Sequence, residues 1–185
     1  SNMICAPLDN ALMRFAKKYQ CTYSRYADDI TFSTSRGIFD KAVVSNDNGE
    51  IALGEELLNL FQQHSFQVNK DKVVLMNQNR HQEVTGLTVN RFVNLRRGYL
   101  KQLRAILHHC EVDGVIPAAK DYITKVKHGN QCLTERLLTQ GKEDELIEWF
   151  RLVIQGKIDY IRQVRGKDSS TYQSIWKTYC AIFGL

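Results

Sequence analysis

The sequence predicts an α+β fold in which an antiparallel sheet with helices is followed by an all-helical domain. Short runs rich in β-branched and aromatic residues flank the tetrapeptide Tyr26–Asp29, as strands flank a tight turn. From Arg96 onward, apolar residues instead recur at the spacing of amphipathic helices. We therefore expect one domain over residues 1–93 and a helical domain over residues 94–185.

The first domain begins with a predicted helix and a hairpin. Residues 6–19 carry apolar side chains at helical spacing, and Pro7 falls in the first turn, where its missing N–H is tolerated. The runs Cys21–Tyr26 and Ile30–Ser33 then have the composition of paired strands. Together they place Tyr26–Asp29 at a hairpin turn.

A second helix and further strands complete this domain. Asp47-Asn48-Gly49 is a turn signal, and Ile51–His64 has leucines on one side, which predicts a helix. Phe66–Val68, Val73–Met76 and Glu83–Val89 are short and strand-like, with polar residues between them.

The second domain is predicted to hold four helices. One begins near Arg96 and ends near Gly114, and Pro117 opens another that runs to about Lys127 and closes at Gly129. Two further apolar stripes mark the other helices, and their members are Leu146, Ile147, Phe150, Val153 and Ile154, then Tyr172, Ile175, Trp176, Tyr179 and Phe183.

The composition limits the class of protein. The 185 residues are 43% hydrophobic and 24% charged, as in soluble globular proteins. No apolar run approaches the ~20 residues of a membrane span, so we expect no membrane partner. The five cysteines are odd in number and form no Cys-x-x-Cys pair, which favours a reducing cytoplasm over a disulfide framework.

The charge is distributed unevenly along the chain. Residues 1–90 have a net charge of −1, whereas residues 91–185 have a net charge of +6. A carboxylate-bearing half joined to a basic half suits an enzyme that binds metal ions and a phosphate backbone. A basic helical half also simply keeps a protein soluble, so the charge alone leaves both interpretations open.

The adjacent carboxylates of Asp28 and Asp29 are the most informative feature. Like charges a few ångströms apart repel one another unless something neutralises them, and a divalent cation such as Mg²⁺ suits hard oxygen ligands. Asp also favours turns without any metal. The doublet alone therefore fits either a metal site or a solvated turn.

Several blocks of the sequence together resemble the bacterial reverse transcriptases, most closely the retron type. The blocks are Tyr26–Asp29, Val68–Lys72, Gln82–Asn90, Arg96–Arg104 and, more weakly, Gln155–Ile161. The resemblance implies the distal part of the palm over 1–93 and the thumb over 94–185. It implies an RNA-directed DNA polymerase, a nucleotidyltransferase that extends a primer on an RNA template from dNTPs by two-metal chemistry.

The resemblance assigns roles to residues of the hairpin. Asp28 is expected to be the main ligand of two Mg²⁺ ions, with Asp29 a weaker ligand that shapes the turn. Tyr26 would pack below the primer terminus, and Ala27 would face the growing end. Lys72, with Lys70 as the second choice, would lie near the incoming triphosphate as a charge stabiliser or proton donor.

Two further groups of residues are expected to bind nucleic acid. The turn formed by Thr85, Gly86 and Leu87 would correspond to the primer grip. In the thumb, Arg97, Lys101 and Arg104 share one helical face. This face is expected to contact the phosphates of the template–primer duplex, although a solvated basic face has the same spacing.

The family pattern has parts that this sequence lacks. A fingers region, a palm strand with another metal-binding aspartate, and a Gln-Gly and Ser-Pro block precede the Tyr-Ala-Asp-Asp hairpin in these enzymes. We therefore expect the chain to be a C-terminal portion of a larger enzyme that does not polymerise alone, because one carboxylate pair cannot hold two ions in a correctly spaced site.

Other classes of protein fit the same motifs, among them abortive-infection and CRISPR-linked relatives. A group II intron-type reverse transcriptase carries a similar box, although it normally adds a maturation domain after the thumb. A catalytically inactive reverse-transcriptase-like module would only bind RNA and would have no need of the Asp28–Asp29 pair. A structured non-coding RNA partner and a role in antiviral defence are associations of the retron family.

Overall fold

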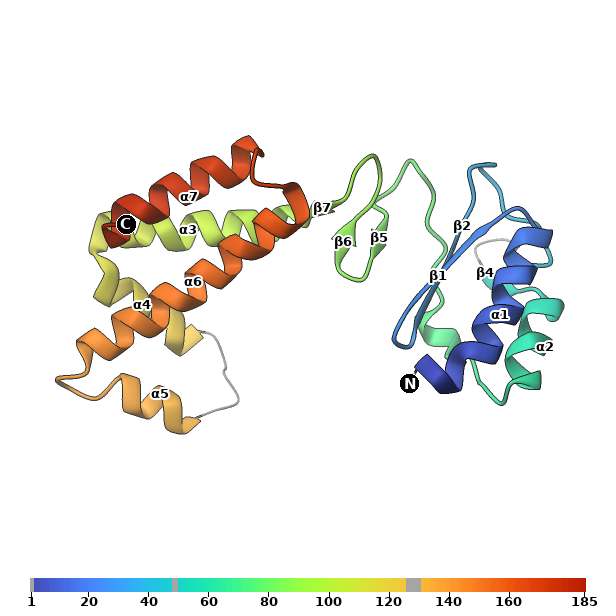
Figure 1. Ribbon diagram of the computed structural model, residues 1–185, viewed down its shortest axis with the longest axis horizontal. Coiled ribbons are helices and arrows are strands. Elements are labelled where there is room, and N and C mark those ends of the chain that lie inside the picture. The colour runs from blue at the N-terminus through green and yellow to red at the C-terminus, as the bar shows by residue number, and fades with distance from the viewer. Residues whose placement is uncertain (1, 48–49, 126–130) are drawn as a thin grey trace. The chain divides into compact units, whose positions relative to one another are not determined.

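A computed structural model of the chain describes residues 2–47, 50–125 and 131–185 (Figure 1). The chain divides into two compact units, residues 1–85 and residues 86–185. Each unit has its own apolar core. The predicted α+β class is confirmed at this level, because helices combine with small antiparallel ladders. The assignment of palm and thumb to residues 1–93 and 94–185 stays a prediction.

The first unit begins with a helix and a hairpin and contains a second small ladder. Its elements are α1 (Asn2–Lys18), β1 (Thr22–Tyr26), β2 (Asp29–Ser33), β3 (Val44–Asp47), β4 (Glu50–Leu53), α2 (Glu55–Gln63), the 3₁₀ helix η1 (Lys70–Lys72) and β5 (Glu83–Val84). β1 pairs with β2 and β3 pairs with β4, both antiparallel. The strands β1 to β4 therefore form two separate two-stranded ladders.

One apolar cluster joins the helices of this unit. Its buried members are Leu8, Leu12, Phe15, Val43, Leu57 and Phe61, and Tyr23, Ile30 and Phe32 of the hairpin are packed against it. The rings of Phe15 on α1 and Phe32 on β2 meet edge to face, with centroids 6.1 Å apart. One face of the β1–β2 hairpin therefore packs on α1, and this contact orients the turn.

The first helix begins earlier than predicted. α1 starts at Asn2, so Pro7 lies inside the helix and not in its first turn. The additional turn carries the exposed side chains of Met3 and Ile4, which are 91% and 75% exposed. The side chains of this turn are not buried at helical spacing. The apolar periodicity of the sequence therefore did not reveal the first turn of α1.

The predicted helix over Ile51–His64 is shorter than expected. Residues 50–53 form β4, and α2 begins only after Gly54. The Gly54 N–H donates to the Val43 carbonyl at 3.1 Å, and a Cβ at Gly54 would lie 1.9 Å from the Ala42 carbonyl oxygen. Only glycine fits this close approach. Residues 48 and 49 of the predicted Asp47–Gly49 turn lie outside the described residues.

The strand-like runs after α2 are mostly not strands. Phe66–Val68 and Val73–Met76 have no strand structure, and of Glu83–Val89 only Glu83–Val84 and Leu87–Thr88 are strands. Phe66 and Val68 are instead partly buried against the core of the first unit. Apolar residues can pack on a core without pairing with another strand. The apolar composition of these runs therefore did not identify strands.

The second unit is mainly helical. Its elements are β6 (Leu87–Thr88), β7 (Asn94–Leu95), α3 (Arg97–Asp113), α4 (Val115–Lys125), α5 (Gln131–Leu137), α6 (Glu143–Arg165) and α7 (Ser170–Phe183). β6 pairs with β7 in an antiparallel ladder. The predicted end of the first helix at Gly114 is confirmed, because this glycine is the C-cap of α3 with φ +89°.

Two details of the helical prediction differ. α4 begins at Val115, two residues before Pro117, so the proline lies inside the first turn. The predicted end of this helix, from Lys127 to Gly129, lies outside the described residues. α5 was not predicted, because its seven residues contain too few apolar side chains to show a helical stripe.

α6 is the central helix of the second unit (Figure 1). Five of its side chains, at 146, 150, 154, 158 and 161, are fully buried, and they repeat every three or four residues. α3, α4 and α7 contribute the other buried members of the same cluster. The face of α3 that points away from this cluster is exposed.

Among the described helices, none combines the length and apolar character that a bilayer span requires. Cys5, Cys21, Cys110 and Cys180 are free thiols.

Candidate active site

The Tyr26–Asp29 tetrapeptide forms the tight hairpin turn that the sequence predicts. The register of β1 and β2 runs from Thr22 opposite Ser33 to Tyr26 opposite Asp29, so only Ala27 and Asp28 form the loop. Ala27 has φ +54°, in the left-handed region. A two-residue loop with a positive φ matches the right-handed twist of the paired strands.

All four residues of this turn are exposed, and Tyr26 has 73% of its surface accessible. The strand before them alternates, with Tyr23 and Arg25 half-buried toward the core and Ser24 exposed. The turn therefore presents Asp28 and Asp29 side by side to solvent. No other described residue forms an ion pair or side-chain hydrogen bond with either carboxylate.

Arg25 connects this turn to α1. Its Nε donates to Asp9 Oδ1 at 2.8 Å, and one terminal nitrogen donates to Asp9 Oδ2 at 2.7 Å. The other terminal nitrogen donates to the Ala27 carbonyl at 2.7 Å. Tyr23 also donates to Asp9, at 2.6 Å. One guanidinium group thus contacts both the helix and the turn.

The electrostatics of this network follow from its contacts. The hydrogen bond from Arg25, helped by the one from Tyr23, lowers the pKa of Asp9 to about 2 against the opposing effect of burial. The same hydrogen bond raises the pKa of Arg25. Burial and, after it, the bond to Asp9 raise the pKa of Tyr23. Asp9 is therefore a carboxylate and Arg25 a cation throughout the physiological range.

The chemistry of the turn fits a divalent cation only in part. Two adjacent exposed carboxylates, which have no cationic partner in the part of the chain that the structure describes, are oxygen ligands of the kind that Mg²⁺ takes. The described residues contain no group of three or more His, Cys, Asp or Glu side chains placed to hold a metal. Asp28 and Asp29 are two carboxylates that could contribute ligands to such a site.

Lys72 lies apart from the hairpin in the chain and ends the 3₁₀ helix η1. The side chain of Asn69 accepts a hydrogen bond from the Asp71 N–H at 3.1 Å and caps this short helix. Lys70 and Lys72 are both exposed. In the described part of the chain, neither lysine forms an ion pair with Asp28 or Asp29.

Thr85 and Gly86 form a second tight turn. Their φ values are +48° and +82°, so both lie in the left-handed region. A Cβ at Gly86 would meet nothing within 4 Å, so the glycine is explained by backbone conformation and not by a close approach within the protein. Leu87 is partly buried against the core of the second unit.

The cationic face of α3 is formed by Arg97, Lys101 and Arg104, which lie four and three residues apart and are all exposed. In the described residues none of the three forms an ion pair. By contrast, Lys125 and Arg151 of the same unit are each paired, with Asp121 and Glu148, both at 2.7 Å.

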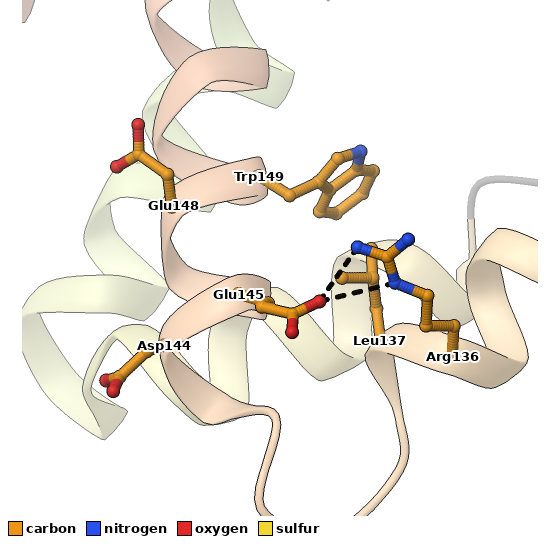
Figure 2. Close-up of a pocket in the computed structure, with 6 residues that line it drawn as sticks. All are labelled: Arg136, Leu137, Asp144, Glu145, Glu148 and Trp149. Atoms are coloured by element: carbon orange, nitrogen blue, oxygen red, sulfur yellow. Dashed lines mark hydrogen bonds and ion pairs between the residues drawn. The ribbon is translucent and has the colours of Figure 1, made fainter.

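A shallow pocket of about 430 Å³ lies between α5 and α6 (Figure 2). Glu145 in its wall bonds Arg136 at 2.9 Å. Lys142, followed by Arg136, lowers the pKa of Glu145. Asp144 and Glu148 add two more carboxylates. An anionic lining repels phosphate groups, and none of the predicted site residues lies in this pocket.

Comparison with known proteins gives three informative relatives. The Retron Mx65 reverse transcriptase of Myxococcus xanthus is 35% identical over 107 residues, which are 58% of this chain and 23% of that protein. The Retron Mx162 reverse transcriptase of the same organism is 31% identical over 59% of this chain and 24% of its own length. The Retron Ec86 reverse transcriptase of Escherichia coli is 25% identical over 75% of this chain and 41% of its own length.

The chain is a homologue of the retron reverse transcriptases. The resemblance noted from the sequence blocks is thereby confirmed. The matched part spans about a quarter of two of these retron reverse transcriptases and about two fifths of the third. No family model and no solved structure matches the chain.

Sequence reasoning missed Asp9 and Arg25 as residues that support the β1–β2 hairpin turn. The sequence places Asp9 directly after the apolar Leu8 and Arg25 within the strand-like run Cys21–Tyr26. Neither pattern indicates which residue pairs with which. That information required the packing of β1 on α1.

Proposed function

We propose that this chain forms the hairpin-bearing palm portion and the thumb of a retron-type RNA-directed DNA polymerase. The observation that carries the proposal is a pair of adjacent, exposed carboxylates beside a two-residue loop, which have no side-chain partner among the described residues, in a homologue of retron reverse transcriptases. A protein that only binds RNA gains nothing from this pair, because two carboxylates repel a phosphate backbone.

In this proposal Asp28 is the principal metal ligand and Asp29 a weaker one that shapes the turn. Two Mg²⁺ ions, when bound, would activate the primer 3′-hydroxyl and stabilise the leaving pyrophosphate of the dNTP. Asp28 projects from the loop itself, whereas Asp29 is held by its pairing with Tyr26. This difference in backbone restraint supports the two roles.

The neighbouring residues would position the reactants. Tyr26 and Ala27 lie next to the carboxylates on the exposed turn, where the primer terminus would approach. The small Ala27 side chain leaves room for a duplex there. Lys72 would stabilise charge on the triphosphate, and Thr85, Gly86 and Leu87 would contact the primer strand. The exposure of Lys72, Thr85 and Gly86 supports these roles.

The cationic face of α3 is proposed to contact the template–primer duplex. Arg97, Lys101 and Arg104 are exposed and have no ion pair among the described residues, so binding a phosphate would not require breaking one. Contacts of this kind are independent of sequence. A structured RNA that carries the template is the partner that fits this chemistry.

The test measures Mg²⁺-dependent dNTP incorporation on an RNA template by the full-length polypeptide that carries this sequence. Asp28→Asn is expected to lower the rate by more than about 100-fold, because it removes the charge that holds the metal. Asp168→Asn is the matched control, since Asp168 is also an exposed turn residue. It is expected to keep the wild-type rate.

Other outcomes contradict the proposal in distinct ways. Incorporation that is unaffected by Asp28→Asn would show that the hairpin does not bind the catalytic metal. If the wild type incorporates nothing but binds RNA with an affinity independent of Asp28, the chain belongs to an RNA-binding module.

A further inference from the structure

The turn that bears the two carboxylates has an unfavourable backbone conformation. Ala27 has φ +54°, and a residue with a Cβ in the left-handed region costs about 1–2 kcal/mol. Glycine, asparagine and aspartate are the usual residues at such a position. A strained conformation of this kind persists only where the surrounding structure fixes it.

The side chain of Arg25 supplies that restraint. Its bond to the Ala27 carbonyl is 2.7 Å long, and its two bonds to Asp9 are 2.7 and 2.8 Å. A weaker bond reaches Asn2 Oδ1 at 3.3 Å. The Arg25 side chain is only 9% exposed and that of Asp9 23% exposed, so the Arg25–Asp9 ion pair is largely shielded from water.

We propose that Arg25 is a positioning residue that acts on Asp28 and Asp29 through the Ala27 carbonyl, with Asp9 of α1 as its anchor. The inference rests on the proposed polymerase function of the hairpin. Arg25 does not touch the reactants in this scheme. It fixes the orientation of the loop peptide, and that peptide fixes the direction in which the carboxylates project.

The planar guanidinium is essential to this role. It presents five N–H donors in a rigid fork, so one pair can hold the Asp9 carboxylate while another N–H reaches the turn. A lysine ammonium is a compact group and cannot span both acceptors with the same geometry. Asp9 fixes the fork at both of its oxygens, which leaves the remaining donor in a defined direction.

The experiment uses the full-length polypeptide and compares Arg25→Lys with Glu56→Gln. The control removes the 2.8 Å Lys18–Glu56 ion pair, which joins α1 to α2 without contacting the turn. Arg25→Lys is expected to lower kcat for dNTP incorporation by roughly 10- to 100-fold, as a small misplacement of reactive groups does. The KM for dNTP is expected to stay within about 3-fold.

Two further readouts separate positioning from a general loss of structure. Mn²⁺ binding without substrates, measured by electron paramagnetic resonance, should weaken several-fold in Arg25→Lys but not in Glu56→Gln. Ala27→Gly relieves the backbone strain, so the loss caused by Arg25→Lys should be at least about 3-fold smaller in an Ala27→Gly background. Asp9→Asn is a second route to the same defect if Arg25→Lys does not fold.

The positioning role is overturned if Arg25→Lys and Asp9→Asn match Glu56→Gln in kcat and in Mn²⁺ affinity. It is also overturned if Arg25→Lys lowers kcat by the same factor whether residue 27 is alanine or glycine. The Asp28→Asn variant shows whether a negative result contradicts the positioning role of Arg25 or the proposed polymerase function. If Asp28→Asn abolishes incorporation while Arg25→Lys does not alter it, only the positioning role is wrong.

Discussion

The hydrogen bond from Arg25 changes the ionisation of Asp9. Its carboxyl normally has a pKa of 3.8, and the hydrogen bond from Arg25 lowers this pKa to about 2 in the folded chain. A folded-state pKa below the unfolded value means that the carboxylate stabilises the fold at every pH above about 4. This stabilisation is lost as the pH falls through about 2.

The stabilisation by the Asp9 carboxylate can be tested by comparing the wild type with Asp9→Asn over a range of pH. The wild type is expected to have a larger free energy of unfolding than the variant from neutral pH down to about pH 4, because only the wild type carries the charge that pairs with Arg25. The difference should shrink as the pH approaches 2. Urea unfolding at each pH measures it, and a difference independent of pH would contradict the assigned pKa.

The residues of the candidate site differ in whether the sequence alone could predict them. Asp28 and Asp29 were predicted, because adjacent carboxylates between two strand-like runs have few explanations. Asp9 and Arg25 were not predicted, because their interaction depends on how a strand packs on a helix. The pairing of distant residues is set by tertiary structure, and periodicity does not contain it.

At the level of the elements, Gly54 gives the sharpest steric constraint. It stands between β4 and α2, and any Cβ there would overlap the Ala42 carbonyl. Gly54→Ala is therefore expected to destabilise the chain by at least about 2 kcal/mol, through forced backbone movement. Gly156→Ala in α6 is the control, because a Cβ there meets nothing within 4 Å.

Gly156→Ala is expected to raise the free energy of unfolding, whereas Gly54→Ala is expected to lower it. Alanine in an exposed helix interior stabilises by about 0.5–1 kcal/mol relative to glycine. Circular dichroism during urea unfolding measures both variants. Equal effects of the two substitutions would show that the contact between Gly54 and Ala42 does not constrain the chain.

Elements with a long, regular apolar stripe were predictable and short ones were not. α3, α6 and α7 bury side chains every three or four residues, and the sequence showed these stripes directly. β4 and α5 have four and seven residues, too few for a period to be recognised. At Glu50–Leu53 the pairing with β3 prevailed over the helical pattern.

On the scale of the whole chain, the excess positive charge of residues 91–185 has a specific expected use. Arg97→Ala with Lys101→Ala should weaken binding to an RNA–DNA duplex and lower the slope of log affinity against log salt by about 2, because each phosphate contact releases roughly one counterion. Filter binding over a range of salt concentrations measures the slope. An unchanged slope would mean that α3 does not contact phosphates.

The matched control for this measurement is Lys125→Ala with Arg151→Ala. It removes the same amount of charge from the same unit, but both cations are engaged with Asp121 and Glu148. Its slope should stay near the wild-type value. The comparison separates a local contact from the general attraction between a basic protein and a polyanion.

The Arg25–Asp9 connection also has a consequence for the order in which the chain folds. Its two residues are separated by 16 positions, and the turn it holds ends at Asp29. Closing so short a segment costs little entropy, and local contacts form faster than distant ones. The geometry of the carboxylates can therefore be established during synthesis, before the ribosome has released the helices that are proposed to hold the duplex.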